Sequence, residues 1–147
     1  MKKVLKVLLG IIIGIVVIGA ILLGVAFFAV NGQTTKKEIT FGDEDIPTIY
    51  AVVGERKVIS VGSGITDKFS YTKVTYDEDV ISNDDVAEYV SHLKDEEDFV
   101  VTENESNLLQ LAKESEEEGE LLLVNIMKEN DSTVIEYRKG EGTLTIY

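Results

Sequence analysis

The side chains of this chain that could do chemistry are mainly carboxylates, since it has 27 Asp and Glu residues, one histidine and no cysteine. Without cysteine, disulfides, thiolate metal sites and thiol nucleophiles are all excluded. The one histidine, His92, lies on the flank of a predicted helix. A catalytic base or a histidine metal ligand needs partner groups, and no second histidine exists to supply one. We therefore interpret His92 as a solvated surface residue.

A Ser-x-x-Lys sequence, Ser70 to Lys73, has the spacing of the nucleophile and its lysine in penicillin-recognising enzymes. In those enzymes the motif opens a helix, so both side chains share a face. Here it lies in residues 68–76, an alternating stretch that predicts a strand, in which residues three apart point to opposite faces. The companion S-D-N and K-T-G motifs are also missing. The sequence thus argues against this activity.

Carboxylates form five short clusters, and carboxylate oxygens are the ligands that calcium prefers. None of the clusters follows the D-x-D-x-D-G spacing of a calcium loop, and each falls in a predicted turn or at a helix end. The clusters are residues 43–45, 77–79, 84–85, 95–98 and 116–118. We expect them to be solvated, and we assign no catalytic, metal-binding or cofactor-binding residue. An enzyme using a carboxylate pair on a cell-wall polymer stays as an alternative, which requires two acids about 5–10 Å apart in one cleft.

The elements that would position these groups follow a long apolar segment. Residues 7–30 contain 24 consecutive uncharged residues, 17 of which are Val, Ile, Leu or Phe. A helix of that length spans roughly 36 Å, against about 30 Å of bilayer hydrocarbon. A removable signal peptide has an apolar region of about 7–15 residues followed by a small-x-small site. Cleavage after Ala29 or Gly32 would place Phe27 or Val30 three residues before the cut, so we predict an uncleaved signal anchor. Secretion after cleavage stays as an alternative.

Basic residues before this segment set its orientation, because basic flanks stay in the cytoplasm. We therefore predict a single-pass protein of the cell membrane with residues 1–6, which include Lys2, Lys3 and Lys6, inside. Residues 31–45 form a polar tether, and residues 46–147 form an extracytoplasmic domain. A face of small residues in the span is a hypothesis for helix self-association; it consists of Gly10, Gly14, Ala20 and Gly24.

The residues from Asn31 onward carry 11 basic against 27 acidic side chains, a balance of −16. Such a domain repels nucleic acid, whose binding depends on cationic contacts with phosphates. It also repels anionic lipid headgroups. We therefore expect no nucleic-acid partner, and contact with the lipid bilayer through residues 7–30 only.

The periodicity of the domain predicts an α+β fold: a small, mostly antiparallel sheet in the order βββ-α-β-α-βββ, with two helices packed on one face. Strands are expected at 46–53, 58–62, 68–76, 98–103, 120–127, 133–139 and 143–147. Residues 120–127 are apolar on both faces and predict a central strand. Helices are expected at 82–98, where Ser82 and Asp85 resemble a capping box, and at 106–119, where Gly119 would cap the C-terminus.

Function follows only in outline from these observations. The layout predicts a membrane-anchored binding or interaction module of the bacterial envelope, whose partner is another envelope protein or a cell-wall component. Any outward-facing tyrosines on the predicted strands would be binding residues, although packing within the sheet is the simpler interpretation. These tyrosines are Tyr50, Tyr71, Tyr76, Tyr137 and Tyr147.

Overall fold

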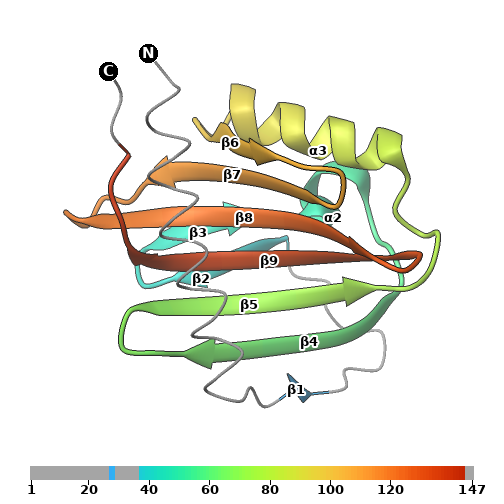
Figure 1. Cartoon of the computed structure of the whole chain (residues 1–147), viewed down its shortest axis with the longest axis horizontal. Helices are drawn as coiled ribbons and strands as arrows, with labels where there is room; N and C mark the ends of the chain where they lie inside the picture. Colours follow the sequence, from blue (N-terminus) through green and yellow to red (C-terminus); the bar gives the residue numbers. More distant parts are fainter. Residues whose placement is uncertain (1–26, 29–36, 145–147) are drawn as a thin grey trace.

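The computed structural model describes residues 27–28 and 37–144. Seven strands form one antiparallel sheet in the order β1-β4-β5-β9-β8-β7-β6, and β2 and β3 form a separate hairpin (Figure 1). The strands are β1 Phe27–Phe28, β2 Glu38–Phe41, β3 Glu44–Pro47, β4 Val58–Ile65, β5 Phe69–Tyr76, β6 Val100–Asn104, β7 Leu108–Glu114, β8 Glu120–Glu129 and β9 Ser132–Glu141. The helices are α2 Ile49–Val53 and α3 Asn83–Asp95.

The two long strands β8 and β9 lie in the middle of the sheet and pair along their whole length, from Glu120 opposite Glu141 to Glu129 opposite Ser132. The turn between them contains only Asn130 and Asp131, and Asn130 has a φ of 57°. Asparagine tolerates this left-handed conformation, which two-residue hairpin turns require. The prediction of a central strand at residues 120–127 is confirmed.

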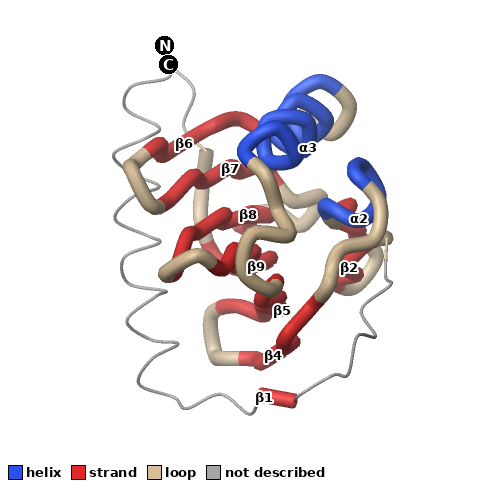
Figure 2. The backbone as a smooth tube through the Cα atoms, turned by 90° about the vertical axis from the view of Figure 1, so that its right-hand side faces the viewer, coloured by secondary structure: helices blue, strands red, loops and turns tan. Residues whose placement is uncertain are grey.

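One face of the sheet is covered by α2, α3 and the β2–β3 hairpin, and we call it the helix face (Figure 2). The main apolar core lies between these layers and includes fully buried Leu122 of β8, Ile135 of β9 and Leu93 of α3. Because side chains alternate along a strand, the intervening residues of β8 and β9 point to the opposite, far face. A smaller apolar cluster lies on that face, with Leu121, Leu123 and Ala112 buried against Leu144.

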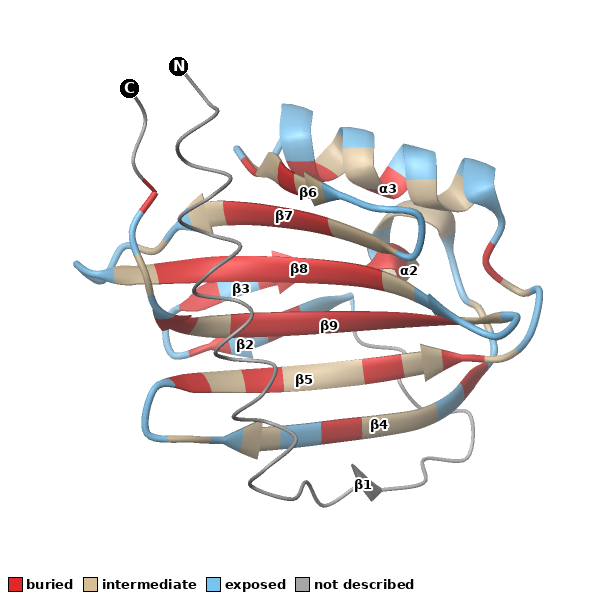
Figure 3. Cartoon of the chain, viewed as in Figure 1, coloured by how far each residue is buried: buried red, intermediate tan, exposed pale blue. Residues whose placement is uncertain are grey.

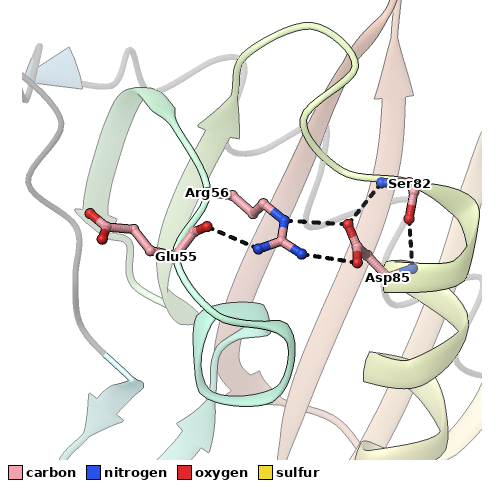
Figure 4. A network of polar contacts seen from close by, with 4 residues as sticks. All are labelled: Glu55, Arg56, Ser82 and Asp85. Carbon is pink, nitrogen blue, oxygen red and sulfur yellow. Dashed lines mark hydrogen bonds and ion pairs between the residues drawn. The ribbon is translucent and has the colours of Figure 1, made fainter.

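The start of α3 is held by a capping box, as the sequence predicted. The Ser82 hydroxyl accepts a hydrogen bond from the Asp85 amide at 3.0 Å, and the Asp85 carboxylate accepts one from the Ser82 amide at 3.0 Å. Arg56, which follows α2 in the chain, donates to the same carboxylate at 3.1 and 3.4 Å (Figure 4). The Ser82 amide and then Arg56 hold the pKa of Asp85 below its ordinary value. This contact fastens α3 to the segment that leads into β4.

The predicted fold class is wrong. The described residues form a mostly antiparallel β-sheet domain, with 52% strand and 17% helix, rather than the expected α+β fold with a transmembrane helix in front. Two helices do lie on one face of the sheet (Figure 2), but only α3 is one of the expected pair, and the element order is not βββ-α-β-α-βββ. Within residues 27–28 and 37–144, no helix is both long and apolar enough to cross a bilayer. The segment 7–30, with the small-residue face inside it, lies outside the described residues except for Phe27 and Phe28, which pair with Gly62 and Val61 of β4.

The helix expected at residues 106–119 is instead strand β7 and the turn after it. Leu108, Leu111 and Ala112 have helical spacing, but a short apolar run fits a strand buried on both faces equally well. In the sheet Leu111 packs in the main core, while Ala112 belongs to the far-face cluster. Gly119 does have a positive φ of 82°, but it lies in the β7–β8 turn. Pairing with β6 and β8 decides the outcome, because those neighbours satisfy the backbone and bury both faces.

The start of the domain also differs from the expectation. The strand expected at 46–53 ends at Pro47, and five of its residues form α2, which buries Ile49 against the sheet. The ordered hairpin β2–β3 occupies part of the expected tether, because Ile39 and Phe41 are buried in the main core. At the other end, β9 continues to Glu141, and residues 143–144 of the strand expected at 143–147 form no strand; residues 145–147 lie outside the described residues.

Candidate functional site

The largest gathering of charged side chains surrounds Lys139 of β9. Its ammonium lies 2.9 Å from Glu44 Oε2, 3.1 Å from Glu117 Oε1 and 3.6 Å from Glu120 Oε2. These glutamates come from β3, from the β7–β8 turn and from the first residue of β8. The lysine side chain is only 10% exposed, and that of Glu44 9%. We call these four residues the Lys139 cluster; it fastens the β2–β3 hairpin to the end of the main sheet.

Glu44 is the buried carboxylate of this cluster. Burial alone would raise its pKa, but hydrogen bonds from the Ser115 hydroxyl at 2.5 Å and the Glu116 amide at 2.8 Å, together with the Lys139 ammonium, hold its pKa below the ordinary value. Conversely, Glu44 and Glu117 outweigh the burial of Lys139 and raise its pKa. Both groups are therefore charged near neutral pH. A general acid needs a raised pKa and a free lysine base needs a lowered one, so this arrangement suits an ionic fastening rather than proton transfer.

A pH dependence follows from Glu44. Its pKa is lowered from 4.5 on folding, so it contributes stability that is present above pH 4.5 and is lost as the pH falls through its folded-state pKa. We expect Glu44→Gln to destabilise the domain at pH 7 by about 1–2 kcal/mol and to flatten the loss of stability below pH 4.5. Urea denaturation between pH 3 and pH 7 measures this. An unchanged acid slope in the variant would show that the pKa of Glu44 is not shifted.

A chain of polar side chains crosses the far face of the sheet. Thr102 of β6 donates to the side chain of Gln110 of β7 at 3.0 Å, and Gln110 donates to Asn125 of β8 at 2.8 Å. Asn125 in turn donates to Glu136 of β9 at 3.4 Å, and Glu136 pairs with Arg138. All five residues are buried. We interpret this row of hydrogen-bonded side chains as a structural network that specifies the register of the four strands β6, β7, β8 and β9.

The edge strand β4 is the third feature that we consider as a functional site. Its sequence, VISVGSGI, contains no charged residue, although 28% of the whole chain is charged. Ile59 is 46% exposed and Ile65 is 85% exposed, and they are the two large apolar residues that stand out as exposed among the described residues. Within those residues the outer edge of β4 is paired only at Val61 and Gly62, by the two-residue strand β1. Natural sheets normally protect such an edge with charges, bulges or a covering element.

The opposite edge, β6, has that protection. It has five residues against eight in β4, and it contains Glu103. Both edge strands have an irregular register, β6 between Val101 and Glu103 and β4 between Val58 and Ser60. The helix α3 lies beside it (Figure 1). Beside β4, by contrast, a groove of about 510 Å³ lies between the strand and β2. Its walls include Val61 and Ser63 of β4 and Ile39 of β2. The outer edge of β4 and this groove are together the candidate interaction site.

The side chains weighed in the sequence do not meet at any of these places as a catalytic set. Ser70 and Lys73 lie in β5, opposite Lys139 and Glu136 respectively, and therefore point to opposite faces of the sheet. His92 is half-exposed on α3, with Glu97 Oε1 at 3.8 Å. In the described part of the chain, no group of three or more His, Cys, Asp or Glu residues has an arrangement that could hold a metal ion.

Buried residues predominate in β7, β8 and β9, whereas the loops and much of α3 are exposed (Figure 3). The tyrosines and acidic clusters are divided between these two environments. Tyr71, Tyr76 and Tyr137 are buried in the sheet, so packing accounts for them. Tyr50 lies on α2 rather than on a strand, and Tyr147 is outside the described residues. Glu44 and Glu117 belong to the Lys139 cluster, which the sequence analysis did not find because residues 44, 117 and 139 have no local pattern in common. The lack of charge in residues 58–65 was a detectable signal for the open edge.

Comparisons with known proteins add no relationship. A scan against protein-family models finds no match to this chain, and searches of curated proteins and of solved structures find none either.

Proposed function

We propose that this chain is a membrane-anchored, extracytoplasmic domain of the cell envelope that acts by binding a partner along the edge of β4. The observation that carries the proposal is the composition of this strand: eight residues without charge, at a sheet edge, with Ile59 and Ile65 exposed. An extended segment added to such an edge gains backbone hydrogen bonds, and neighbouring grooves supply side-chain specificity. The partner contributes one further strand to the sheet.

The membrane part of the proposal rests on residues 7–30 and on the lysines before them. The apolar side chains of this segment favour bilayer insertion by about 5–10 kcal/mol, and basic flanks keep the N-terminus in the cytoplasm. Small residues at Gly10, Gly14, Ala20 and Gly24 would allow two such segments to approach closely. Because Phe27 and Phe28 fall inside the inserted segment, anchoring removes β1 from the edge of β4 and leaves that edge open to a partner.

The geometry of the acidic residues does not support the alternative of a carboxylate-dependent enzyme. The three glutamates of the Lys139 cluster do converge, but they converge on an ammonium, and the lowered pKa of Glu44 keeps it ionised. A glycosidase pair requires one protonated carboxyl as the general acid.

Site-specific photocrosslinking in intact cells tests the proposal. A photoreactive amino acid at Ser63, on β4, is expected to give a crosslinked adduct of the full-length chain in the membrane fraction. The same residue at Asn104, equally exposed at the end of β6, is expected to give none. External protease should digest the domain in intact cells. The proposal is overturned if Ser63 gives no adduct beyond the level at Asn104, or if the chain is found in the cytosol.

A further inference from the structure

We infer that the segment added at this edge is β4 of a second copy of the same chain, so that two membrane-anchored chains form one continuous sheet about a twofold axis at Gly62. This inference rests on the proposed function and names its partner. In a twofold interface, if residue i lies opposite residue j, then j lies opposite i. When two β4 strands pair in an antiparallel way, the sequence numbers of the two residues in every opposing pair therefore add up to the same value.

The hydrogen-bonding pattern restricts that sum to even values. Opposing residues in an antiparallel ladder either both direct their backbone groups at each other or both direct them away, and these two states alternate along a strand. Two identical strands can satisfy this only when opposing residues are both even-numbered or both odd-numbered. The regular part of β4, from Ser60 to Ile65, allows a twofold axis at Gly62. Gly62 then lies opposite itself, Val61 opposite Ser63, and Ser60 opposite Gly64.

This register matches the features of the strand that the single chain leaves unexplained. Ile59 and Ile65 lie three residues on either side of Gly62, so each exposed isoleucine of one copy meets the other exposed isoleucine of its partner at the two ends of the paired strands. The irregular register between Val58 and Ser60 lies at the same end as Ile59. Burial of these two side chains removes the largest exposed apolar surface among the described residues.

The charges beyond the strand are complementary in the same register. Lys57 lies just before β4 and Asp67 in the turn after it, each five residues from Gly62, so each end of the paired strands brings a lysine of one copy near an aspartate of the other. The Lys57 side chain is 73% exposed although it pairs with Asp77 at 2.9 Å. Two acidic domains repel each other, but salt limits this repulsion to about 8 Å at physiological ionic strength. An uncharged strand ending in opposite charges is therefore suited to meeting a copy of itself.

The contact between Phe27–Phe28 and β4 shows that this edge accepts an antiparallel strand at Val61 and Gly62. The two residues of β1 are a weak competitor for the seven β4 residues, 59–65, that pair in this register, and insertion of residues 7–30 into the bilayer withdraws them. A strand edge is a narrow interface. Anchoring of both chains in one membrane supplies the high effective concentration that such an interface needs.

Cysteine crosslinking tests the register, because the native chain has no cysteine. Opposing residues in an antiparallel pair have Cα atoms about 4.5 or 5.5 Å apart, within the roughly 4.4–6.8 Å of a disulfide. We expect full-length Gly62→Cys, oxidised in membranes, to form a disulfide-linked dimer. The matched control is Ser60→Cys, because two Ser60 residues would lie about 14 Å apart, four residues along the strand. Its crosslinking should remain at background.

Two further variants keep the test decisive if cysteine at Gly62 disturbs the strand. The double variant Lys57→Cys with Asp67→Cys, at two exposed positions, should also dimerise, whereas Lys57→Cys alone should not. On the Gly62→Cys background, Ile65→Lys should reduce the dimer about tenfold, because each copy would place an unpaired charge against an apolar residue. Asn104→Lys, at the opposite edge, adds the same charge and should leave the dimer unchanged.

The inference is overturned if neither Gly62→Cys nor the double variant gives a dimer in membranes, or if Ser60→Cys crosslinks as strongly as Gly62→Cys. The Ser63 photocrosslink then separates the two proposals. An adduct with a different protein would reject the second copy while the binding function stands. The absence of any adduct would reject the binding function as well.

Discussion

Replacing Tyr89 with alanine is expected to lower the free energy of unfolding by about 4 kcal/mol, the upper range for loss of a large buried aromatic side chain. The side chain is fully buried in the main core, on the face of α3 that packs against the sheet. Its hydroxyl donates a hydrogen bond to the Pro47 carbonyl at 2.6 Å, which joins α3 to the end of β3. The alanine variant loses the ring, the hydrogen bond and this connection together. Urea denaturation followed by far-ultraviolet circular dichroism measures the change.

Two phenylalanine variants separate the hydroxyl from the ring. Tyr89→Phe keeps the ring and leaves the Pro47 carbonyl without this donor, so we expect a loss of about 1 kcal/mol. Tyr137 is equally buried, but its hydroxyl has only weak polar contacts, with the Tyr89 hydroxyl and the Ile49 backbone, and none with good hydrogen-bond geometry. A hydroxyl held only by such weak contacts contributes little, so we expect Tyr137→Phe to cost less stability than Tyr89→Phe. A loss for Tyr137→Phe as large as that for Tyr89→Phe would contradict this account of the core.

Replacing Lys139 with methionine is expected to lower the free energy of unfolding by about 2–3 kcal/mol at pH 7. The substitution keeps most of the apolar stem but removes the ammonium, which leaves the Glu44 carboxylate largely buried beside two like charges. Breaking a buried ion pair by removing one partner costs about 3–5 kcal/mol. We expect somewhat less here, because Glu44 keeps its hydrogen bonds to Ser115 and Glu116 and because Glu117 is largely exposed.

The pH dependence of this loss identifies its cause. The cost should shrink as the pH falls through the lowered pKa of Glu44, because protonation of that carboxylate removes the buried charge that the lysine neutralised. The control is Lys57→Met, which also breaks an ion pair but at a largely exposed lysine. We expect it to cost clearly less than Lys139→Met at pH 7, because exposed ion pairs contribute little to stability. An equal cost for both variants, or a cost for Lys139→Met that does not vary with pH, would exclude an ionic role for the Lys139 cluster.

Sequence periodicity was reliable where the local signal was long or redundant. The helix after Ser82 combines an N-cap, a capping acid and an apolar stripe, and α3 begins at Asn83 as these features predict. It failed for residues 106–119, where the short stretch from Leu108 to Ala112, apolar except for Gln110, suits a strand and a helix equally. It also failed for residues 46–53, where Pro47 ends the strand and the next residues turn into α2. In both segments pairing or packing with distant residues decides the structure, and a local window contains none of that information.

The sequence by itself determined the absence of thiol chemistry, the separation of an apolar segment from an acidic domain, the start of α3 and the central place of β8. These properties depend on residue types, or on patterns within about fifteen neighbouring positions. Only the tertiary structure decided that Glu44, Glu117 and Lys139 meet, because three separate elements must fold together to bring them within hydrogen-bonding distance. It also decided that β4 lies at an edge. The order of strands depends on which distant partners pair, and that order exposes the outer side of an uncharged strand.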